Sequence, residues 1–341
     1  MDKQRRNFLK KTGAAGVVAL AAGASAPESS LGQGAGPGAS PGSPAAPKRM
    51  TFVTLRSGDA YGLGVKTDLG ILDVTKTAKF LRSPAPTTIE DLIRRGDRGL
   101  TELVKVALAR RTPGFFISED RAEFGPCVTN PEKILCVGLN YARHARETNN
   151  PIPKLPILFN KFNNALNSHG GTVRVSSIPA ERFDYESELV IVMGKKARNV
   201  SEAEALSYVF GYCNGNDFTA RDLQRVSSQW MLGKTLDGSA PIGPYLVTAD
   251  QVPDPNRLEI ECRVNGEVRQ SSNTADMVFG CASLVSYISK YFTLKPGDII
   301  FTGTPEGVIS GYPKERQVWL KAGDRLTSTL EGLGELQFSL S

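Results

Sequence analysis

The stretch Phe183-Asp184-Tyr185-Glu186-Ser187-Glu188-Leu189-Val190-Ile191-Val192-Met193-Gly194 is the part of the chain around which the fold is expected to form. The residues after Glu188 are apolar, largely β-branched and closed by a glycine, a pattern typical of a strand. Alternate side chains of a strand share a face, so Glu186 and Glu188 are predicted to point the same way. The alternative interpretation is an edge strand whose carboxylates are solvated.

A third carboxylate follows in Asn216-Asp217-Phe218-Thr219-Ala220-Arg221-Asp222. Asp217 stands beside a predicted Gly-Asn turn and offers a further oxygen donor. Neighbouring carboxylates repel one another unless a cation lies between them. Three carboxylates without histidine or cysteine suit a hard divalent ion that keeps some water positions for a substrate. The sequence therefore predicts a metal site made by Glu186, Glu188 and Asp217.

Composition describes an ordinary globular chain of 341 residues with 40% hydrophobic and 22% charged residues. The net charge of +6 is concentrated at the start, where the first 26 residues hold five basic residues and one acidic residue. Without them the net charge falls to +2, and no later basic run is interleaved with aromatics. A nucleic-acid partner is therefore not expected.

The amino terminus has the order of features expected of an export signal. A twin-arginine pattern, Gln4-Arg5-Arg6-Asn7-Phe8-Leu9-Lys10, precedes a short apolar run and the small residues Ala24-Ser25-Ala26. We expect residues 1–26 to be a signal peptide, which places the mature protein in the periplasm without a membrane anchor. The alternative is an ordinary basic amphipathic start. Residues 27–48 are a Gly/Pro/Ala/Ser stretch predicted to be a flexible linker.

The remaining chain divides into a small amino-terminal domain, residues 49–126, and a catalytic domain, residues 127–341. Short strands predominate without regular strand–helix alternation, which disfavours a doubly wound sheet and favours an α+β body with mixed β structure. Asn265-Gly266 is a hairpin signal. Helices are expected at 201–208, 219–226 and 276–292. The five cysteines form no Cys-x-x-Cys pair, and several lie in apolar runs, so buried thiols are expected.

A histidine follows the predicted strand at 134–137, in Gly138-Leu139-Asn140-Tyr141-Ala142-Arg143-His144-Ala145-Arg146-Glu147. If this segment is helical, His144 and Glu147 share a face. A glutamate that holds one imidazole nitrogen leaves the other free to accept a proton from water. The alternative is a surface histidine beside a salt partner.

Two further segments carry candidate polar groups. Lys234 lies among apolar and glycine residues, where a partly desolvated ammonium could stabilise an enolate or a carboxylate. The alternative is a lysine whose head reaches solvent at a turn. In Thr302-Gly303-Thr304-Pro305-Glu306-Gly307-Val308 the glycines let backbone amides approach an anion, and Thr304 adds a hydroxyl. Taken alone, this segment is a tight turn.

Other chemistries lack their motifs. The one Gly-x-Ser-x-Gly match lies in the linker, no Gly-x-Gly-x-x-Gly is present, and histidine and cysteine do not cluster as zinc ligands do.

These segments, in this order, resemble the fumarylacetoacetate hydrolase superfamily, and together they span about residues 133–334. The matching segments are residues 137–141 with His144, 184–194, 216–222, 233–234, 241–244, 295–298 and 302–308. Residues 272–279 resemble its acylpyruvase and 2-hydroxyhepta-2,4-diene-1,7-dioate isomerase branch. Where the family usually has proline after Phe159-Asn160-Lys161, this chain has Phe162, which is expected to alter the pocket wall.

The resemblance implies a mixed β-roll or β-sandwich of the family's carboxy-terminal type, usually dimeric, with Mg²⁺ or Mn²⁺ on the three carboxylates. It implies that a keto or diketo acid chelates the metal and that Lys234 steadies the enolate. His144, oriented by Glu147, would activate water for attack on the distal carbonyl, which cleaves a carbon–carbon bond. The residues implied in substrate binding are Tyr141, Arg221, Gln224 and Thr304.

The leading hypothesis is thus a metal-dependent hydrolase of acylpyruvate-type diketo acids. One alternative is an isomerase, tautomerase or decarboxylase of small 2-oxo or 2-hydroxy-dienoate dicarboxylates on the same metal site. A third is a non-catalytic exported protein that binds dicarboxylates.

Overall fold

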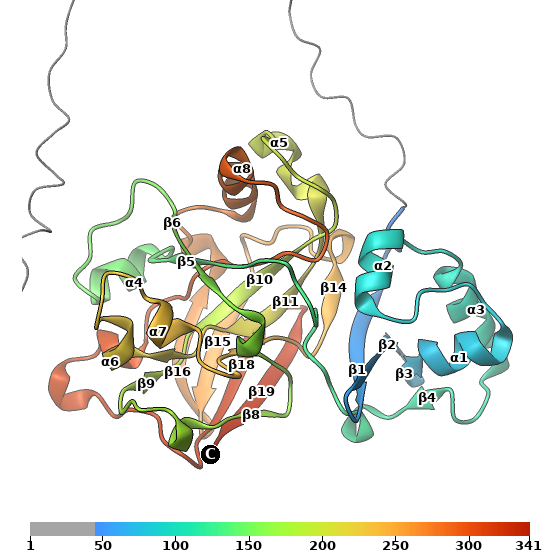
Figure 1. The fold of residues 1–341 in the computed structure, drawn as a ribbon, viewed down its shortest axis with the longest axis horizontal. Helices are drawn as coiled ribbons and strands as arrows, with labels where there is room; N and C mark the ends of the chain where they lie inside the picture. Colours follow the sequence, from blue (N-terminus) through green and yellow to red (C-terminus); the bar gives the residue numbers. More distant parts are fainter. Residues whose placement is uncertain (1–44) are drawn as a thin grey trace, which may run out of the picture. The chain divides into compact units, whose positions relative to one another are not determined.

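The computed structural model describes residues 45–341, and its centre is a ten-stranded sheet (Figure 1). The strands follow the order β4 (Phe116–Ile117), β3 (Gly70–Asp73), β2 (Ala60–Thr67), β1 (Thr51–Ser57), β14 (Leu246–Thr248), β11 (Val209–Asn216), β10 (Ser187–Met193), β17 (Ile299–Phe301), β5 (Ile134–Gly138) and β6 (Ile157–Lys161). Only the β17–β5 pair is parallel within this order.

A second sheet of five strands lies beside the first. Its order is β16 (Glu267–Asn273), β15 (Glu259–Val264), β18 (Arg325–Leu330), β19 (Gly334–Leu340) and β8 (Gly171–Val173). The β15–β16 hairpin turns at Asn265 and Gly266, both with positive φ, so the predicted turn is confirmed. Two short pairs complete the β structure: β9 (Phe183–Asp184) with β12 (Thr219–Ala220), and β7 (Leu166–Asn167) with β13 (Ala240–Pro241). The α+β prediction is confirmed.

Strand β10 is central, so the edge-strand interpretation is wrong. It pairs with β11 on one side and β17 on the other, and all seven of its residues are buried. Val190 and Val192 belong to one hydrophobic cluster, whereas Leu189 and Ile191 belong to another. Burial on both faces explains why the strand is a continuous apolar run rather than an alternating one.

The amino-terminal segment continues the large sheet, because β1 pairs with β14 through Thr51 and Val247. Its helices α1 (Val74–Leu81), α2 (Ile89–Arg95) and α3 (Leu100–Arg110) contribute to the same hydrophobic cluster as Val190. The break between α2 and α3 falls at Gly96–Gly99, where both glycines have positive φ. The domain division at residue 126 stays a prediction.

Some sequence-based boundaries are wrong. Helix α8 (Cys281–Tyr291) begins five residues later than predicted, after a 3₁₀ turn and an irregular segment. The helix predicted at 219–226 is confined to α6 (Arg221–Gln224), because Thr219 and Ala220 pair with β9. The Gly-Asn turn predicted before Asp217 is instead the end of β11. The prediction at 201–208 is confirmed in extent, because α5 (Glu202–Ala205) follows the capping residue Ser201 and continues as a 3₁₀ turn to Tyr208.

All five cysteines are buried and free, as expected from their apolar neighbours. The predicted signal peptide, and the predicted linker up to residue 44, lie outside the described residues. Within residues 45–341, no helix has both the length and the apolar character needed to cross a bilayer.

Candidate active site

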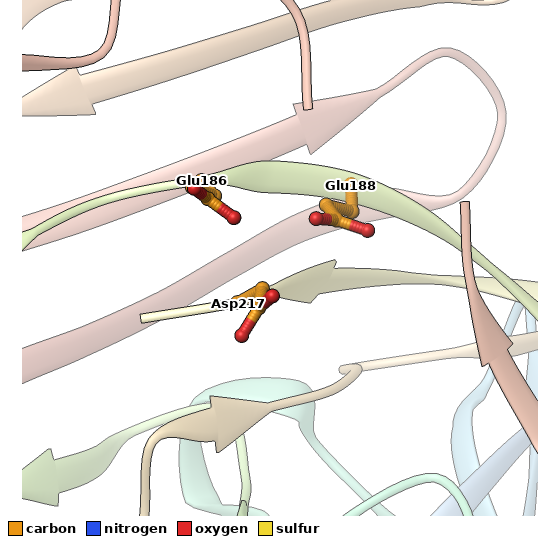
Figure 2. Close-up of side chains that lie close together, drawn as sticks. All are labelled: Glu186, Glu188 and Asp217. Carbon is orange, nitrogen blue, oxygen red and sulfur yellow. The ribbon is translucent and has the colours of Figure 1, made fainter. Parts of the chain in front are cut away.

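The three predicted carboxylates lie together at the junction of β10 and β11 (Figure 2). Glu188 is on β10, Glu186 immediately precedes that strand, and Asp217 immediately follows β11. Ser187 pairs with Asn216, so Glu186 and Asp217 adjoin, and the Asp217 backbone N–H donates to the Glu186 carbonyl over 2.9 Å. One oxygen from each carboxylate lies within 4.8 Å of the others, and all three residues are buried.

Three buried or nearly buried cations surround the cluster. Lys234 Nζ lies 2.7 Å from both Glu186 Oε2 and Asp217 Oδ2. Lys161 Nζ lies 2.6 Å from Asp217 Oδ1, and Arg221 Nη1 lies 2.7 Å from Glu186 Oε1. These contacts exclude the interpretation of Lys234 as a lysine that reaches solvent.

Glu188 is the carboxylate without an ion pair among the described residues. Its Oε2 accepts from the Gly303 backbone N–H over 2.6 Å. Burial, together with Asp217 and Glu186, raises the pKa of Glu188 well above its usual value. Burial opposes ionisation of Glu186 as well, but Lys234 and Arg221 outweigh it and hold the pKa of Glu186 at about 2.

The donor set suits a hard divalent cation. The cluster supplies oxygen donors from three side chains. Among the described residues, no cationic side chain pairs with Glu188. A cation between the three carboxylates would remove the repulsion that raises the pKa of Glu188. Glu186, Glu188 and Asp217 therefore fit a site for an ion such as Mg²⁺ or Mn²⁺.

Arg221 also forms an ion pair with a buried aspartate, Asp184. Its Nε donates to Asp184 Oδ2 over 2.8 Å, and Asp184 also accepts from the backbone N–H groups of Ile309 and Ser310. The side chain of Asp184 is inaccessible to solvent, so its charge is satisfied by these donors. Arg221 Nη2 is buried and has no hydrogen-bond partner among the described residues.

A cavity of about 290 Å³ opens onto the cluster, and His144 lines it. His144 lies on α4 (Ala142–Glu147) and is 6% exposed, so it is not a surface histidine. Its Nδ1 lies 2.8 Å from Glu147 Oε1, and Glu147 Oε2 accepts from the Gly307 backbone N–H over 2.8 Å. Because Glu147 accepts a hydrogen bond from Nδ1–H, Nε2 is left as the proton acceptor.

Aromatic side chains form part of the cavity wall beside Lys234. Phe159 and Trp230 pack edge to face with ring centroids 5.2 Å apart, and Lys234 Nζ lies 5.2 Å from the Phe159 centroid. Gly138 permits this packing, because a Cβ there would lie 2.5 Å from the Trp230 ring. Phe162, which we expected to alter this wall, is instead exposed and is not among the cavity's lining residues.

The remaining predicted site residues differ in their access to the cavity. Gln224 and Thr304 line it, with Gln224 Oε1 accepting from Arg221 Nη1 over 3.2 Å. The Thr304 hydroxyl is already engaged, since it donates to the Ser187 carbonyl and accepts from Gln270 Nε2. Tyr141 is fully buried, does not line the cavity, and its hydroxyl has no partner among residues 45–341.

Sequence reasoning gave no role to Lys161 or Asp184. Both side chains are inaccessible to solvent and each neutralises a group at the site. The available signal for Asp184 was its place two residues before Glu186. For Lys161 the available signal was a charged residue at the end of a predicted strand that begins Ile157-Leu158-Phe159.

Much of the chain matches a known protein family and its relatives. Residues 133–341 match the model of the family described as "Fumarylacetoacetate (FAA) hydrolase C-terminal". The mitochondrial oxaloacetate tautomerase FAHD2A of Bos taurus is 40% identical over 280 residues, which are 82% of this chain and 86% of that protein.

Solved structures show the same relationship. A fumarylacetoacetate hydrolase from Exiguobacterium antarcticum is 30% identical with a TM-score of 0.68, covering 86% of this chain and 99% of that one. The fumarylpyruvate hydrolase of Pseudomonas aeruginosa, solved with Mn²⁺ and pyruvate, is 35% identical with a TM-score of 0.55, covering 64% and 91% of the two chains.

These comparisons correct the predicted location. Relatives from Bos taurus, Xenopus laevis and Homo sapiens are all named as mitochondrial proteins, which contradicts the prediction of a periplasmic protein. The twin-arginine pattern at residues 4–10 therefore does not establish export.

Proposed function

Since the chain is an enzyme of the fumarylacetoacetate hydrolase family, we propose that it interconverts the keto and enol forms of a short 2-oxo acid at the acidic cluster. The observation that carries this proposal is that one cavity brings together His144, Lys234 and the carboxylates Glu186 and Glu188. Tautomerisation needs a base, a stabilised enolate and little else. The oxaloacetate tautomerase named above supports a four-carbon 2-oxo dicarboxylate as substrate.

Glu186, Glu188 and Asp217 would hold a divalent cation, and Mg²⁺ and Mn²⁺ both suit these oxygen donors. When bound, such an ion supplies Lewis-acid polarisation of the 2-oxo group and of the adjacent carboxylate.

His144 would act as the base. Its Nε2 accepts a proton from carbon 3 of the substrate, while Nδ1–H remains bonded to Glu147 and the imidazolium charge is balanced by that carboxylate. Protonation of the 2-oxygen, and loss of the proton from Nε2 to solvent, complete the change without net gain or loss of atoms.

Lys234 and Arg221 would balance the negative charge that develops on the substrate. Lys234 uses two of its three N–H groups on Glu186 and Asp217, which leaves one N–H for a substrate oxygen. The buried Nη2 of Arg221, which has no hydrogen-bond partner within residues 45–341, offers a second donor. Both groups are fixed by carboxylates before the substrate binds, so little reorganisation is needed.

Hydrolysis of a carbon–carbon bond is the second candidate. The neighbouring fumarylpyruvate hydrolase structure, which contains pyruvate, favours it, as does the His144–Glu147 pair. Here Nε2 would take a proton from water, the oxygen would add to the distal carbonyl, and the bond between carbons 3 and 4 would break. Pyruvate would leave as its enolate and then be protonated. The alternative of a non-catalytic binding protein is not retained for an enzyme of this family.

The two reactions are separable with one protein preparation. Purified protein in Mn²⁺, Mg²⁺ or EDTA is assayed for decay of the enol absorbance of oxaloacetate and for cleavage of acylpyruvates to pyruvate. We expect metal-dependent acceleration of oxaloacetate ketonisation that Glu186→Gln abolishes. Pyruvate release without any effect on oxaloacetate would favour the hydrolase, and no metal-dependent turnover of either substrate would refute both candidates.

A further inference from the structure

Among the charged residues that line the cavity, one guanidinium has no partner among the residues that the structure describes. The charged lining residues are His144, Glu186, Glu188, Arg221, Arg225 and Lys234. Arg221, Lys234 and His144 each have a carboxylate partner. Arg225 is exposed, and across residues 45–341 it makes no ion pair and no side-chain hydrogen bond. A cation without a protein partner at the cavity is available to a ligand.

The position of Arg225 follows from α6. Arg221, Gln224 and Arg225 are spaced i, i+3 and i+4, so they share one side of this helical turn, and all three line the cavity. Arg221 reaches inward to Glu186 and its side chain is only 10% exposed. Four residues later the chain has advanced by about 6 Å along the helix axis. Arg225 is exposed whereas the Arg221 side chain is largely buried, so Arg225 is the outer of the two arginines.

The inner and outer arginines of this turn both lack acceptors within the described part of the chain. There, Arg221 Nη2 is buried without a hydrogen-bond partner, and the whole Arg225 guanidinium is unpaired. A ligand with anionic oxygens at both ends would satisfy both groups. The planar fork of arginine matches a carboxylate in a bidentate arrangement, which lysine or glutamine cannot reproduce.

We propose that Arg225 binds the second carboxylate of a short 2-oxo dicarboxylate, and so makes the enzyme prefer dicarboxylates to 2-oxo monocarboxylates. The proposal rests on the function given above, because it takes the 2-oxo carboxylate end to lie at the acidic cluster. Arg225 contributes ground-state binding at the end of the substrate that does not react. Its loss should therefore appear in KM rather than in kcat.

The test compares two probes of similar length in one assay. Exchange of the carbon 3 protons of oxaloacetate and of 2-oxobutyrate into deuterated water is followed by NMR with the Mg²⁺-loaded enzyme. We expect Arg225→Gln to raise the KM for oxaloacetate about tenfold or more, the loss of a charged hydrogen bond. The KM for 2-oxobutyrate should stay within about twofold, and Arg225→Lys should fall between the wild type and Arg225→Gln.

The control is Arg257→Gln, which removes an exposed arginine that does not line the cavity and should leave both KM values unchanged. If the wild type exchanges both probes but Arg225→Gln leaves the ratio of the two KM values unchanged, the proposed role of Arg225 is wrong. The proposed function would still stand. If the wild type exchanges neither probe, the proposed function fails. In that case the Kd values for 2-oxoglutarate and 2-oxobutyrate are measured by calorimetry with the Mn²⁺-loaded wild type and Arg225→Gln. An unchanged ratio of these two Kd values would overturn the role of Arg225, and a raised ratio would support it.

Discussion

Lys161 Nζ lies 2.6 Å from Asp217 Oδ1, and both side chains are inaccessible to solvent. The lysine ends β6 at one edge of the large sheet, and the aspartate follows β11. A buried charge of this kind is tolerated because its partner compensates it.

We therefore expect Lys161→Met to be strongly destabilising, because it leaves Asp217 with one cation fewer in a buried site. Loss of one partner of a buried pair costs about 3–5 kcal/mol, reduced here by the second contact from Lys234. The measurement is the free energy of unfolding in urea with EDTA present. Lys295→Met, which breaks an exposed pair with Glu132, is the matched control and should change the free energy of unfolding far less. Equal effects of the two substitutions would contradict the argument.

The metal-free protein should lose stability as the pH rises. Burial and the neighbouring carboxylates raise the pKa of Glu188 in the folded state above its ordinary value of 4.5. At a pH between the pKa of Glu188 in the unfolded chain and its raised pKa in the folded protein, only the folded protein keeps this proton. The free energy of unfolding therefore falls with increasing pH. Urea titrations in EDTA from about pH 5 to about pH 8 measure this slope.

Glu188→Gln provides the matching variant, because it removes the titrating group at nearly constant volume. Its pH slope in EDTA should be shallower than that of the wild type, and it should bind Mn²⁺ more weakly in calorimetric titrations. A wild-type slope that survives in Glu188→Gln would assign the pH dependence to another group.

Replacement of His144 should slow the reaction without loosening the metal. We expect His144→Gln to lower kcat about 10²- to 10⁴-fold, the usual contribution of a general base. Glu147→Gln should have a smaller effect in the same direction, because it removes the negative charge beside the imidazole but not the base itself. His169→Asn is the control, since His169 does not line the cavity. Mn²⁺ affinity that fell in parallel with kcat would place His144 in the metal shell instead.

The sequence was informative where the chemistry is local and less so where it depends on sheet order. Glu186 and Glu188 are two residues apart, so a strand pattern suffices to bring them together, and Asp217 follows the adjacent strand. Strands β5, β17 and β10 lie between β6 and β11 in the sheet, yet Lys161 of β6 meets Asp217, which follows the end of β11. Such long-range pairing leaves no periodic signal in the segment that contains Lys161.

The predicted start of the helix at residue 219 was wrong for a related reason. The residues at 219 and 220 have helical neighbours but pair with β9, and this pairing positions Arg221 to reach Asp184. Tertiary pairing therefore overrode local preference next to the site. Arg225 stood in the predicted helix, but its lack of a partner is visible only when the contacts of its neighbours are known.

Gly233→Ala should test whether the close packing of α6 against α7 (Met231–Lys234) positions Lys234. A Cβ at residue 233 would lie 2.5 Å from both the Ala220 carbonyl oxygen and the Gln224 backbone nitrogen, so the two helices must separate. We expect a loss of about 1–3 kcal/mol in the free energy of unfolding, as for other overpacked sites, and a lower kcat because Lys234 shifts with α7. Ser228→Ala, an exposed substitution in the same connection, should change neither quantity. Wild-type kcat in a destabilised Gly233→Ala variant would show that Lys234 is held by Glu186 and Asp217 alone, whatever the spacing of the helices.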